Sequence, residues 1–370
     1  MAAPGLKTEE LLVNMGPQHP STHGVLRLVL TIDGETIVDC DPVIGYLHSS
    51  LEKIAERKTY RQYTTYTDRY DYLNSLGNNL VYVQAVERLM GIEVPPRCQY
   101  IRVIMAELNR LASHLVYFGT LGLDVGATTV FLHCFREREV IIDLMEHTTG
   151  QRLLYNYLRI GGVRNDLPPD FEAGLRHFLS YFPKRIEEYN DLLTRNRIFR
   201  ARMEGVGVIS AEKALQYGCS GPVIRGCGLP YDMRKIEGYA AYPELEFDVP
   251  TQPYGDAMSR HLVRVEEMRQ SVNILRQALD KLPKGPVRAE NVPRVIRPPA
   301  GEVFERVESP RGELGCYIKS DGSDKPERLH WRGPSFYNLQ AFRDMVRGHL
   351  IADLVVILAS IDIVLADIDR

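Results

Sequence analysis

One amphipathic stretch, residues 97–122, limits most strongly what this chain can fold into. Its apolar side chains recur at mixed spacings of three and four residues, which predicts a single long helix with a buried face. The recurring residues are Ile101, Ile104, Met105, Leu108, Leu111, Ala112 and Leu115. Because a helix with such a face must be covered by other elements, we expect it at the centre of a helix bundle.

Further helical patterns begin at about residue 51 and occupy much of the middle of the chain. We expect helices at 78–91, begun by Asn78 and ended by Gly91, at 130–150, at 166–196 as two helices separated by Pro183, and at 256–282. Residues 205–250 are rich in glycine and proline and predict loops with a few short strands.

The two β-hairpins predicted from the sequence lie near the two ends of the chain. Residues 25–41 predict a hairpin turning at Asp33-Gly34, and residues 312–335 predict a second, turning at 321–323. Strands and helices do not alternate, and "GVGVIS" lacks the third glycine of a dinucleotide-binding fingerprint. We therefore predict an α+β fold, a helix-bundle core with small antiparallel sheets near the N- and C-terminal parts.

The expected organisation is one structural unit with three parts. Residues 1–50 carry the N-terminal loop and β-hairpin, and residues 51–290 form the helical core with its loop-rich insertion near 205–250. Residues 291–370 carry the C-terminal hairpin and a C-terminal segment. The apolar run 350–369 contains four aspartates, which favours a buried core segment over a membrane span.

Charge and cysteine usage exclude several classes of protein. The 370 residues have a formal net charge of −3, which argues against nucleic acid as a partner. The N-terminal residues lack a secretory signal, so we expect the protein on the cytosolic side. The six cysteines form no CxxC pair, so we expect no metal or iron-sulfur cluster in this chain. A disulfide between Cys219 and Cys227 is possible by spacing but disfavoured by a reducing compartment.

Two histidines four residues apart precede the first strand, in "GPQHPSTHGVLRL". Together with His48, His19 and His23 suggest a zinc site, a proton-transfer site, or loop residues without chemistry. Pro20 disfavours the helix that would align the two imidazoles on one metal. Proton transfer needs only one imidazole and a carboxylate, for which Asp71 and Asp124 are candidates.

Asp124 and the tyrosine-rich stretch 63–75 have two interpretations each. Asp124 lies among apolar residues and glycines, where it either pairs with a partner or caps the helix expected near residue 130. The tyrosines of "YTTYTDRYDYLNS" either contact a large, partly apolar ligand such as a quinone or simply place their hydroxyls in water.

The motifs together resemble the D subunit of respiratory complex I, the NADH:quinone oxidoreductase. They run in family order over nearly the whole chain: "NMGPQHPSTHGVLRL", "GYLHSSLEKIAERKTY", "DRYDYLNS", "RVIMAELNRLASHL", "LGLDVGA", "FREREVIIDLMEHTTGQR", "RIGGVRNDLP", "YDMRK", "FDVP", "DAMSRHLVRVEEMRQS" and "ESPRGELGCYIKSDG". The resemblance implies a relative of the nickel-iron hydrogenase large subunit without its metal site. Where hydrogenases have CxxC pairs, this chain has "DRYDYLNS" and "SIDIVLADIDR".

The resemblance also implies site residues and partners. His23 and Tyr72 match the hydrogen-bond and proton donors to the quinone, Asp124 matches the acid that pairs with the histidine, and His19 and His48 match supporting positions in the quinone cavity. The B subunit of the complex would supply the 4Fe-4S cluster, and the C and I subunits and the membrane-embedded H subunit would be neighbours. The location implied is peripheral, at the cytoplasmic face of the cell membrane.

Three positions depart from the family pattern. Leu154 and Ser49 stand where many relatives have histidine and arginine near the cluster, which suggests a more reducing cluster and a low-potential quinone such as menaquinone. Ile363 replaces the proline of a C-terminal "DP" pair, which affects local geometry. The electron donor stays open between NADH and ferredoxin or coenzyme F420, and a scaffold with a decayed quinone site is the remaining alternative.

Overall fold

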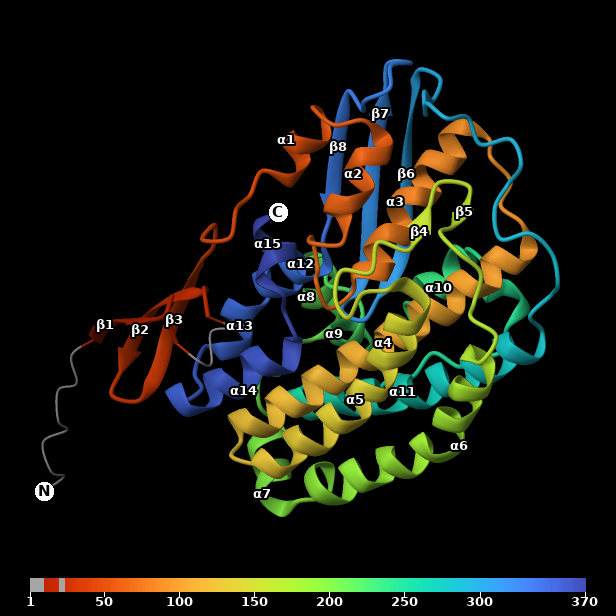
Figure 1. Ribbon diagram of the computed structural model, residues 1–370. Helices are drawn as coiled ribbons and strands as arrows, with labels where there is room; N and C mark the ends of the chain where they lie inside the picture. The colour runs from red at the N-terminus through yellow and green to blue at the C-terminus, as the bar shows by residue number, and fades with distance from the viewer. Residues whose placement is uncertain (1–9, 20–23) are drawn as a thin grey trace, which may run out of the picture.

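The computed structural model describes residues 10–19 and 24–370, and its architecture is α+β (Figure 1). Four long helices form the bundle expected from the sequence: α4 (Pro96–Asp124), α5 (Thr128–Thr149), α6 (Phe171–Tyr189) and α11 (Ala257–Asp280). Helix α4 packs against both α5 and α11, and α6 packs against the same two helices. The stretch that predicted a central helix therefore lies at the centre of the bundle.

Helix α6 contradicts the expectation of two helices separated by Pro183, because it runs through the proline. A proline inside a helix removes one backbone hydrogen bond and costs roughly 3 kcal/mol. Phe178, Phe182 and Ile186 lie on the buried face on both sides of it, and their burial outweighs that cost. The backbone changes to a short π-helix, η2 (Asn190–Thr194), only after Tyr189.

Helix α3 (Ser75–Met90) begins earlier than predicted. Asn78 does not start it; the amide of Asn78 lies buried inside the helix and donates to the backbone oxygen of Asp71 at 3.0 Å. Asparagine often caps helices through its side chain, but the side chain of Asn78 makes this tertiary hydrogen bond instead. Gly91 ends the helix in a left-handed conformation, as expected.

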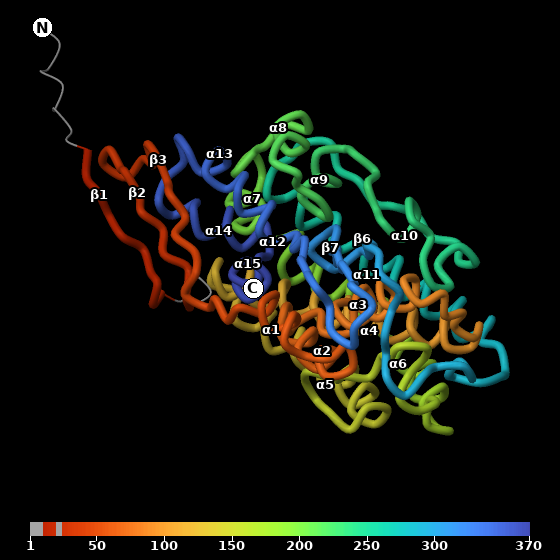
Figure 2. Tube along the Cα trace, turned by 90° about the horizontal axis from the view of Figure 1, so that it is seen from above, coloured from red at the N-terminus to blue at the C-terminus, as the bar shows by residue number. Residues whose placement is uncertain are grey.

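The N-terminal sheet has one strand more than the sequence predicted. The hairpin of β2 (Arg27–Asp33) and β3 (Thr36–Val43) is confirmed, and β1 (Glu10–Met15) pairs antiparallel with β2. The histidine-containing stretch therefore connects β1 to β2. The sheet lies at one side of the molecule, and β3 contacts α13 (Phe342–Val346) (Figures 1 and 2).

The C-terminal sheet contains the predicted second hairpin, β7 (Gly312–Ser320) and β8 (Arg328–Arg332), with β6 (Gly301–Ser309) added beside β7. Helix α3 packs on β6 and β7. Residues 205–250 carry no strand, contrary to prediction, but short helices: α8 (Ala211–Gln216), α9 (Pro222–Arg225), α10 (Met233–Ile236) and the 3-10 helix η3 (Tyr242–Glu244). Side chains cap two of them, Ser210 for α8 and Asp232 for α10.

The C-terminal segment is buried, as predicted. It forms α14 (Ile351–Ile361) and α15 (Leu365–Asp369), which pack with α12 (Pro334–Gln340), α13 and the inner face of the N-terminal sheet. The remaining elements are α1 (Leu51–Ala55), α2 (Tyr60–Thr67), β4 (Leu158–Arg159), β5 (Gly162–Val163) and α7 (Arg197–Met203). Within the described residues, none of the helices combines the length and the hydropathy needed to cross a bilayer.

Candidate functional site

Tyr72 lies in the connection between α2 and α3, next to a residue whose buried side chain holds this connection in place. The neighbouring carboxylate of Asp71 is buried and accepts hydrogen bonds from Arg311 Nη1 at 3.0 Å and from its own loop, Leu73 N, at 3.0 Å. The Tyr72 side chain is instead 43 % exposed. Partial burial, and then the negative charge of Asp71, raise the pKa of the Tyr72 phenol. The loop is therefore held in place through buried Asp71, while the phenol of Tyr72 is exposed.

Arg311 contacts three segments that are far apart in sequence: the Tyr72 loop, α4 and the residue after α14. It is fully buried in the turn between β6 and β7, and its Nη1 also donates to Ser113 of α4 at 3.1 Å. Its Nη2 lies 3.7 Å from Asp362 Oδ1, just after α14. Burial raises the pKa of Asp71 to about 6 although Arg311 opposes the shift. This anchor, defined as Asp71, Ser113, Arg311, Asp362 and Asp367, fixes the base of the Tyr72 loop.

The last member of the anchor lies in α15, and burial raises the pKa of its carboxyl group. Asp367 Oδ2 accepts a hydrogen bond from Ser335 N at 2.8 Å, which ties α15 to the start of α12. The carboxylate also lies close to Gly333 and to the ring hydroxyl of Tyr70. Tyr70 in turn stacks on Trp331 with ring centroids 4.7 Å apart.

The same C-terminal helix holds the loop that contains His48. The carboxylate of Asp369 accepts hydrogen bonds from Gly45 N and Leu47 N, both at 2.7 Å. His48 Nδ1 donates to the backbone oxygen of Asp369 at 2.7 Å. The structure thus brings the His48 loop and the base of the Tyr72 loop onto one C-terminal segment.

The other predicted residues are placed only in part. His23 lies outside the described residues, whereas His19 is half-buried in the connection after β1. Asp124 is the last residue of α4, and the N-cap of α5 is Ala127, so the interpretation of Asp124 as a helix cap for α5 is wrong. Its side chain reaches the surface, and desolvation by the surrounding chain raises its pKa to about 6.

Several large apolar side chains that are near predicted site residues in sequence, or in the turn after α5, are exposed. They are Ile44, Tyr46 and Leu47 before His48, Leu123 before Asp124, and Leu153 in the turn after α5. Each of these side chains is more than a third exposed. If these side chains form one contiguous apolar surface, that surface is of the kind covered by another protein or a ligand.

Sequence reasoning did not find Arg311, Asp362 or Ser113. A buried arginine carries no periodicity, and its partners are separated from it by up to 240 residues along the chain. The only local signal is the turn motif "SPRGE", which places Arg311 between two strands.

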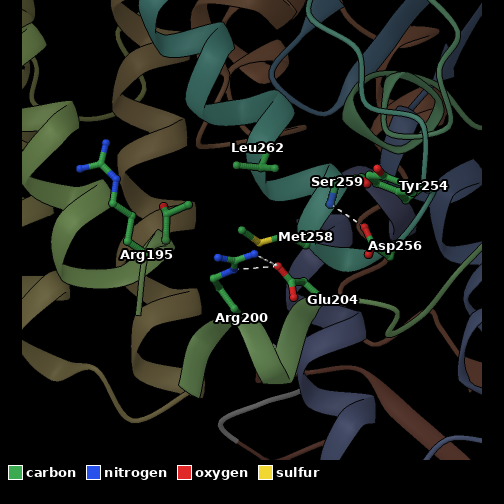
Figure 3. Close-up of a pocket in the computed structure, with 9 residues that line it drawn as sticks. Arg195, Arg200, Glu204, Tyr254, Asp256, Met258, Ser259 and Leu262 are labelled. Atoms are coloured by element: carbon green, nitrogen blue, oxygen red, sulfur yellow. Dashed lines mark hydrogen bonds and ion pairs between the residues drawn. The ribbon is translucent and has the colours of Figure 1, made fainter. Parts of the chain in front are cut away.

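A separate pocket of about 620 Å³ lies between η2, α7 and the start of α11 (Figure 3). Arg200 forms an ion pair with Glu204 at 2.7 Å, and the carboxylate of Asp256 accepts from Ser259 N at 2.7 Å as the cap of α11. The lining contains none of the residues predicted for the site. Both polar contacts have a structural role, so the volume of this pocket alone does not mark it as the functional site.

Neither a metal-binding cluster nor a disulfide occurs in the described part of the chain. It contains no group of three His, Cys, Asp or Glu side chains arranged to hold a metal ion. All six thiols are free, and Cys219 Sγ and Cys227 Sγ each face a backbone oxygen.

Comparison with known proteins gives one consistent result. Residues 124–370 match the family model described as respiratory-chain NADH dehydrogenase, 49 Kd subunit. The D subunit of the NADH-quinone oxidoreductase of Desulforamulus reducens is 51 % identical over 98 % of this chain and 99 % of its own length. The D subunit numbered 2 of Symbiobacterium thermophilum is 51 % identical with the same coverage, and the D subunit of Bacillus cytotoxicus is 50 % identical over 98 % of this chain and its own full length.

The matches extend over nearly the whole chain at about 50 % identity. Similarity of this extent indicates that the chain shares the fold of these proteins and belongs to the same kind of complex. The chain is therefore a subunit of an oxidoreductase complex of the electron-transport type, with quinone as a substrate of that complex. It belongs to the family of the 49 kDa subunit of respiratory-chain NADH dehydrogenase, whose bacterial members are named as the D subunit of NADH-quinone oxidoreductase.

Proposed function

We propose that this chain forms the quinone-reduction site of a proton-pumping NADH:quinone oxidoreductase together with the B subunit, which holds the terminal 4Fe-4S cluster. The observation that carries the proposal is the outward-facing phenol of Tyr72 on a base fixed by the buried ion pair of Asp71 and Arg311. A phenol on a loop that is held in place is well suited to transfer a proton to one particular atom of a bound ligand.

The anchor also supports a hydrogenase-like arrangement. "DRYDYLNS" and "SIDIVLADIDR" correspond, by resemblance, to the two metal-binding segments of hydrogenases. In this chain Arg311 lies between them, within hydrogen-bonding distance of Asp71 and 3.7 Å from Asp362. A guanidinium among carboxylates then occupies the region where the relatives place a metal, and the quinone cavity adjoins it.

The proton chemistry assigned to this site uses three side chains. Tyr72 and His23 donate hydrogen bonds to the quinone and release protons as negative charge develops on its oxygen atoms, and Asp124 pairs with His23. A phenol titrates near ~10 and an imidazole near ~6.5, so the phenol gives up its proton only beside a strong base. The raised pKa of Tyr72 keeps the phenol protonated until that stage. His19 and His48 complete the cavity in supporting roles.

The exposed apolar side chains support a site completed by partner chains. Ile44, Tyr46 and Leu123 are exposed close in sequence to the predicted site residues His48 and Asp124, and would be covered in the assembled complex. The partners proposed are the B, C and I subunits and the membrane-embedded H subunit, with quinone as the substrate. The corresponding location is peripheral, at the cytoplasmic face of the cell membrane.

Two departures favour menaquinone as the quinone. Leu154 is half-buried with a left-handed backbone (φ 59°), and Ser49 is exposed. Neither side chain can supply the positive charge that histidine or arginine would bring to a neighbouring cluster, which leaves the cluster more reducing.

Two alternatives concern the electron donor and the activity itself. Ferredoxin or coenzyme F420 in place of NADH would leave this subunit nearly unchanged, because the electron-input module lies on other chains. A scaffold with a decayed quinone site would not need Tyr72 held on a buried anchor, so the geometry favours an active site.

The test is Tyr72→Phe in the assembled complex, with Tyr254→Phe as the control, since Tyr254 is also exposed but lines the separate pocket. We expect quinone reduction to fall at least tenfold in Tyr72→Phe because the donated proton is lost. Reduction of the cluster in the B subunit should stay normal. Unchanged quinone turnover in Tyr72→Phe would contradict the assigned role.

A further inference from the structure

A second group of charged side chains lies in the interior, between α4, α9, α10, α11 and the end of β6. We call it the interior charge cluster; it consists of Glu107, Arg110, Arg225, Asp232, Arg234, Glu267 and Glu308. Its members are at most 4 % exposed. The functional site described above makes no use of them.

Glu308, at the end of β6, is held by contacts from three helices and from the loop after α10. Its Oε1 accepts from Arg225 Nη1 at 2.7 Å, and its Oε2 accepts from Met233 N at 3.1 Å. Arg110 Nη2 donates to its backbone oxygen at 2.6 Å, and its backbone N–H donates to the hydroxyl of Tyr239 at 3.0 Å. The carboxyl is thus fixed in place with one direct cationic partner.

That cationic partner is shared. Arg225 also contacts Glu267 through Nη2 and lies 3.8 Å from Asp232 through Nη1. The other two guanidiniums are committed elsewhere, since Arg234 pairs with Asp232 at 2.7 Å and with Glu107 at 3.1 Å, and Arg110 pairs with Glu107 at 3.3 Å. Glu308 therefore competes for a cation that already neutralises another carboxylate.

The balance of charge follows from these contacts. Four carboxylates face three guanidiniums, so one negative charge has no cation if every group is ionised. The neighbouring imidazole of His114, 2.9 Å from Glu267, is fully buried, and burial lowers its pKa. An uncompensated buried charge is costly enough that the group binds a proton instead.

The position of that proton can be assigned. Neighbouring guanidiniums hold the pKa values of Glu107, Asp232 and Glu267 below their usual range against the effect of burial. Burial raises the pKa of Glu308 to about 7, with Asp232 adding to the shift and Arg225, Arg110 and Arg234 opposing it. The groups facing Glu308 from all sides thus make it the carboxyl of the cluster that holds a proton most tightly.

The cluster adjoins the anchor beneath Tyr72. Glu308 is three residues before Arg311 on the same β6–β7 hairpin, and His114 follows Ser113 of the anchor on α4. Within the described residues, the buried atoms Arg110 Nη1 and His114 Nδ1 have no hydrogen-bond partner. Such atoms are the usual hydrogen-bond partners of buried water.

We infer that Glu308 is a proton-storing site inside this subunit. Its carboxylic acid loses a proton to the phenolate left when Tyr72 gives its own proton to the quinone, and the resulting carboxylate takes up a proton from solution before the next turnover. Only this coupling to Tyr72 rests on the proposed function; the protonated Glu308 in the resting complex does not.

Infrared spectroscopy of the assembled complex tests the inference. We compare wild type with Glu308→Gln, and use Glu313→Gln as the matched control, because Glu313 is the buried carboxyl directly opposite Glu308 on the hairpin. We expect a protonated-carboxyl band that shifts in D2O, falls to half its intensity near pH 7, and is absent only from Glu308→Gln. Glu308→Asp keeps the acid, so its band should move in frequency rather than vanish.

Two results of these measurements would contradict the proposal, and each affects a different part of it. If the band persists unchanged in Glu308→Gln, the inference is overturned. A band that fails to change when the quinone is reduced would overturn the coupling to Tyr72. Normal quinone turnover in Tyr72→Phe would remove the proposed function while leaving the resting band of Glu308 in place, so the two failures are distinguishable.

Discussion

Gly333 packs directly against Asp367 of the anchor. A Cβ added there would lie 1.7 Å from Asp367 Oδ1 and 2.3 Å from the hydroxyl oxygen of Tyr70. The backbone itself is ordinary, with φ at −88°. The requirement for glycine is therefore one of space and not of conformation.

We expect Gly333→Ala to lower the free energy of unfolding by about 1–3 kcal/mol, since the methyl group must displace a packed carboxylate. Quinone reduction should fall as well, because Asp367 belongs to the base of the Tyr72 loop. Thermal unfolding of this chain in the assembled complex measures the first effect. Gly301→Ala is the control, as its nearest new contact is Leu89 at 4.0 Å. Equal midpoints for the two variants would show that the packing around Gly333 yields readily.

Sequence patterns reveal only some residues of the site. Tyr72, Asp124 and His48 lie in motifs that can be recognised one at a time, and Tyr72 is exposed as a ligand-facing phenol should be. Arg311 and Asp367 could not be found in this way. Their roles arise only when residues far apart in sequence meet in the interior, and no local pattern encodes such a meeting.

Helix α15 is the element that connects the two loops of the candidate site. Its Asp369 accepts both backbone N–H groups of the His48 loop, whereas its Asp367 serves the anchor. Removing the first contact while keeping the second isolates the contribution of this helix to the His48 loop.

We expect Asp369→Ala to increase hydrogen exchange at the amides of Gly45 and Leu47 by at least tenfold, because each loses a carboxylate acceptor and a hydrogen bond to a charged group contributes about 1.5–3 kcal/mol. Exchange in the helix bundle should not change. Hydrogen exchange with mass spectrometry on the assembled complex provides the measurement, and Asp353→Ala on α14 is the control. If both variants protect the loop equally, partner subunits hold it and α15 does not.

The types of the long elements could be predicted, whereas their ends and several short elements could not. The bundle helices carry long apolar repeats, and the two hairpins carry turn signals. Together these patterns predicted the α+β class correctly. Pro183 failed as a helix end because buried phenylalanines on both sides outweigh its cost. The strand β1 was missed because most of its side chains are exposed, which leaves no alternation to detect.

The molecule as a whole places many titratable groups in its interior, and their effects on stability have opposite signs. Burial raises the pKa values of Asp68 and Glu308 to about 7 and of Asp71 to about 6. A raised carboxyl pKa stabilises the fold fully below the unfolded value, and this contribution is lost as pH rises through the folded value. Burial lowers the pKa of His261 to about 3, so its effect is complete above the unfolded value near ~6.5.

Above pH 6.5 the buried carboxylic acids therefore dominate, and we expect the stability of this chain to fall between pH 6.5 and 8. Asp68 tests this directly because it is 1 % exposed and accepts a hydrogen bond from Asn79, which an amide oxygen can also accept. Asp68→Asn should lose less stability over that interval than wild type, since the amide does not ionise. The measurement is the temperature at which this chain loses solubility in the assembled complex, taken at each pH. Asp353→Asn, at a partly exposed carboxyl on α14, should follow wild type. Parallel curves for all three proteins would show that Asp68 does not change its ionisation between pH 6.5 and 8, which would contradict the prediction.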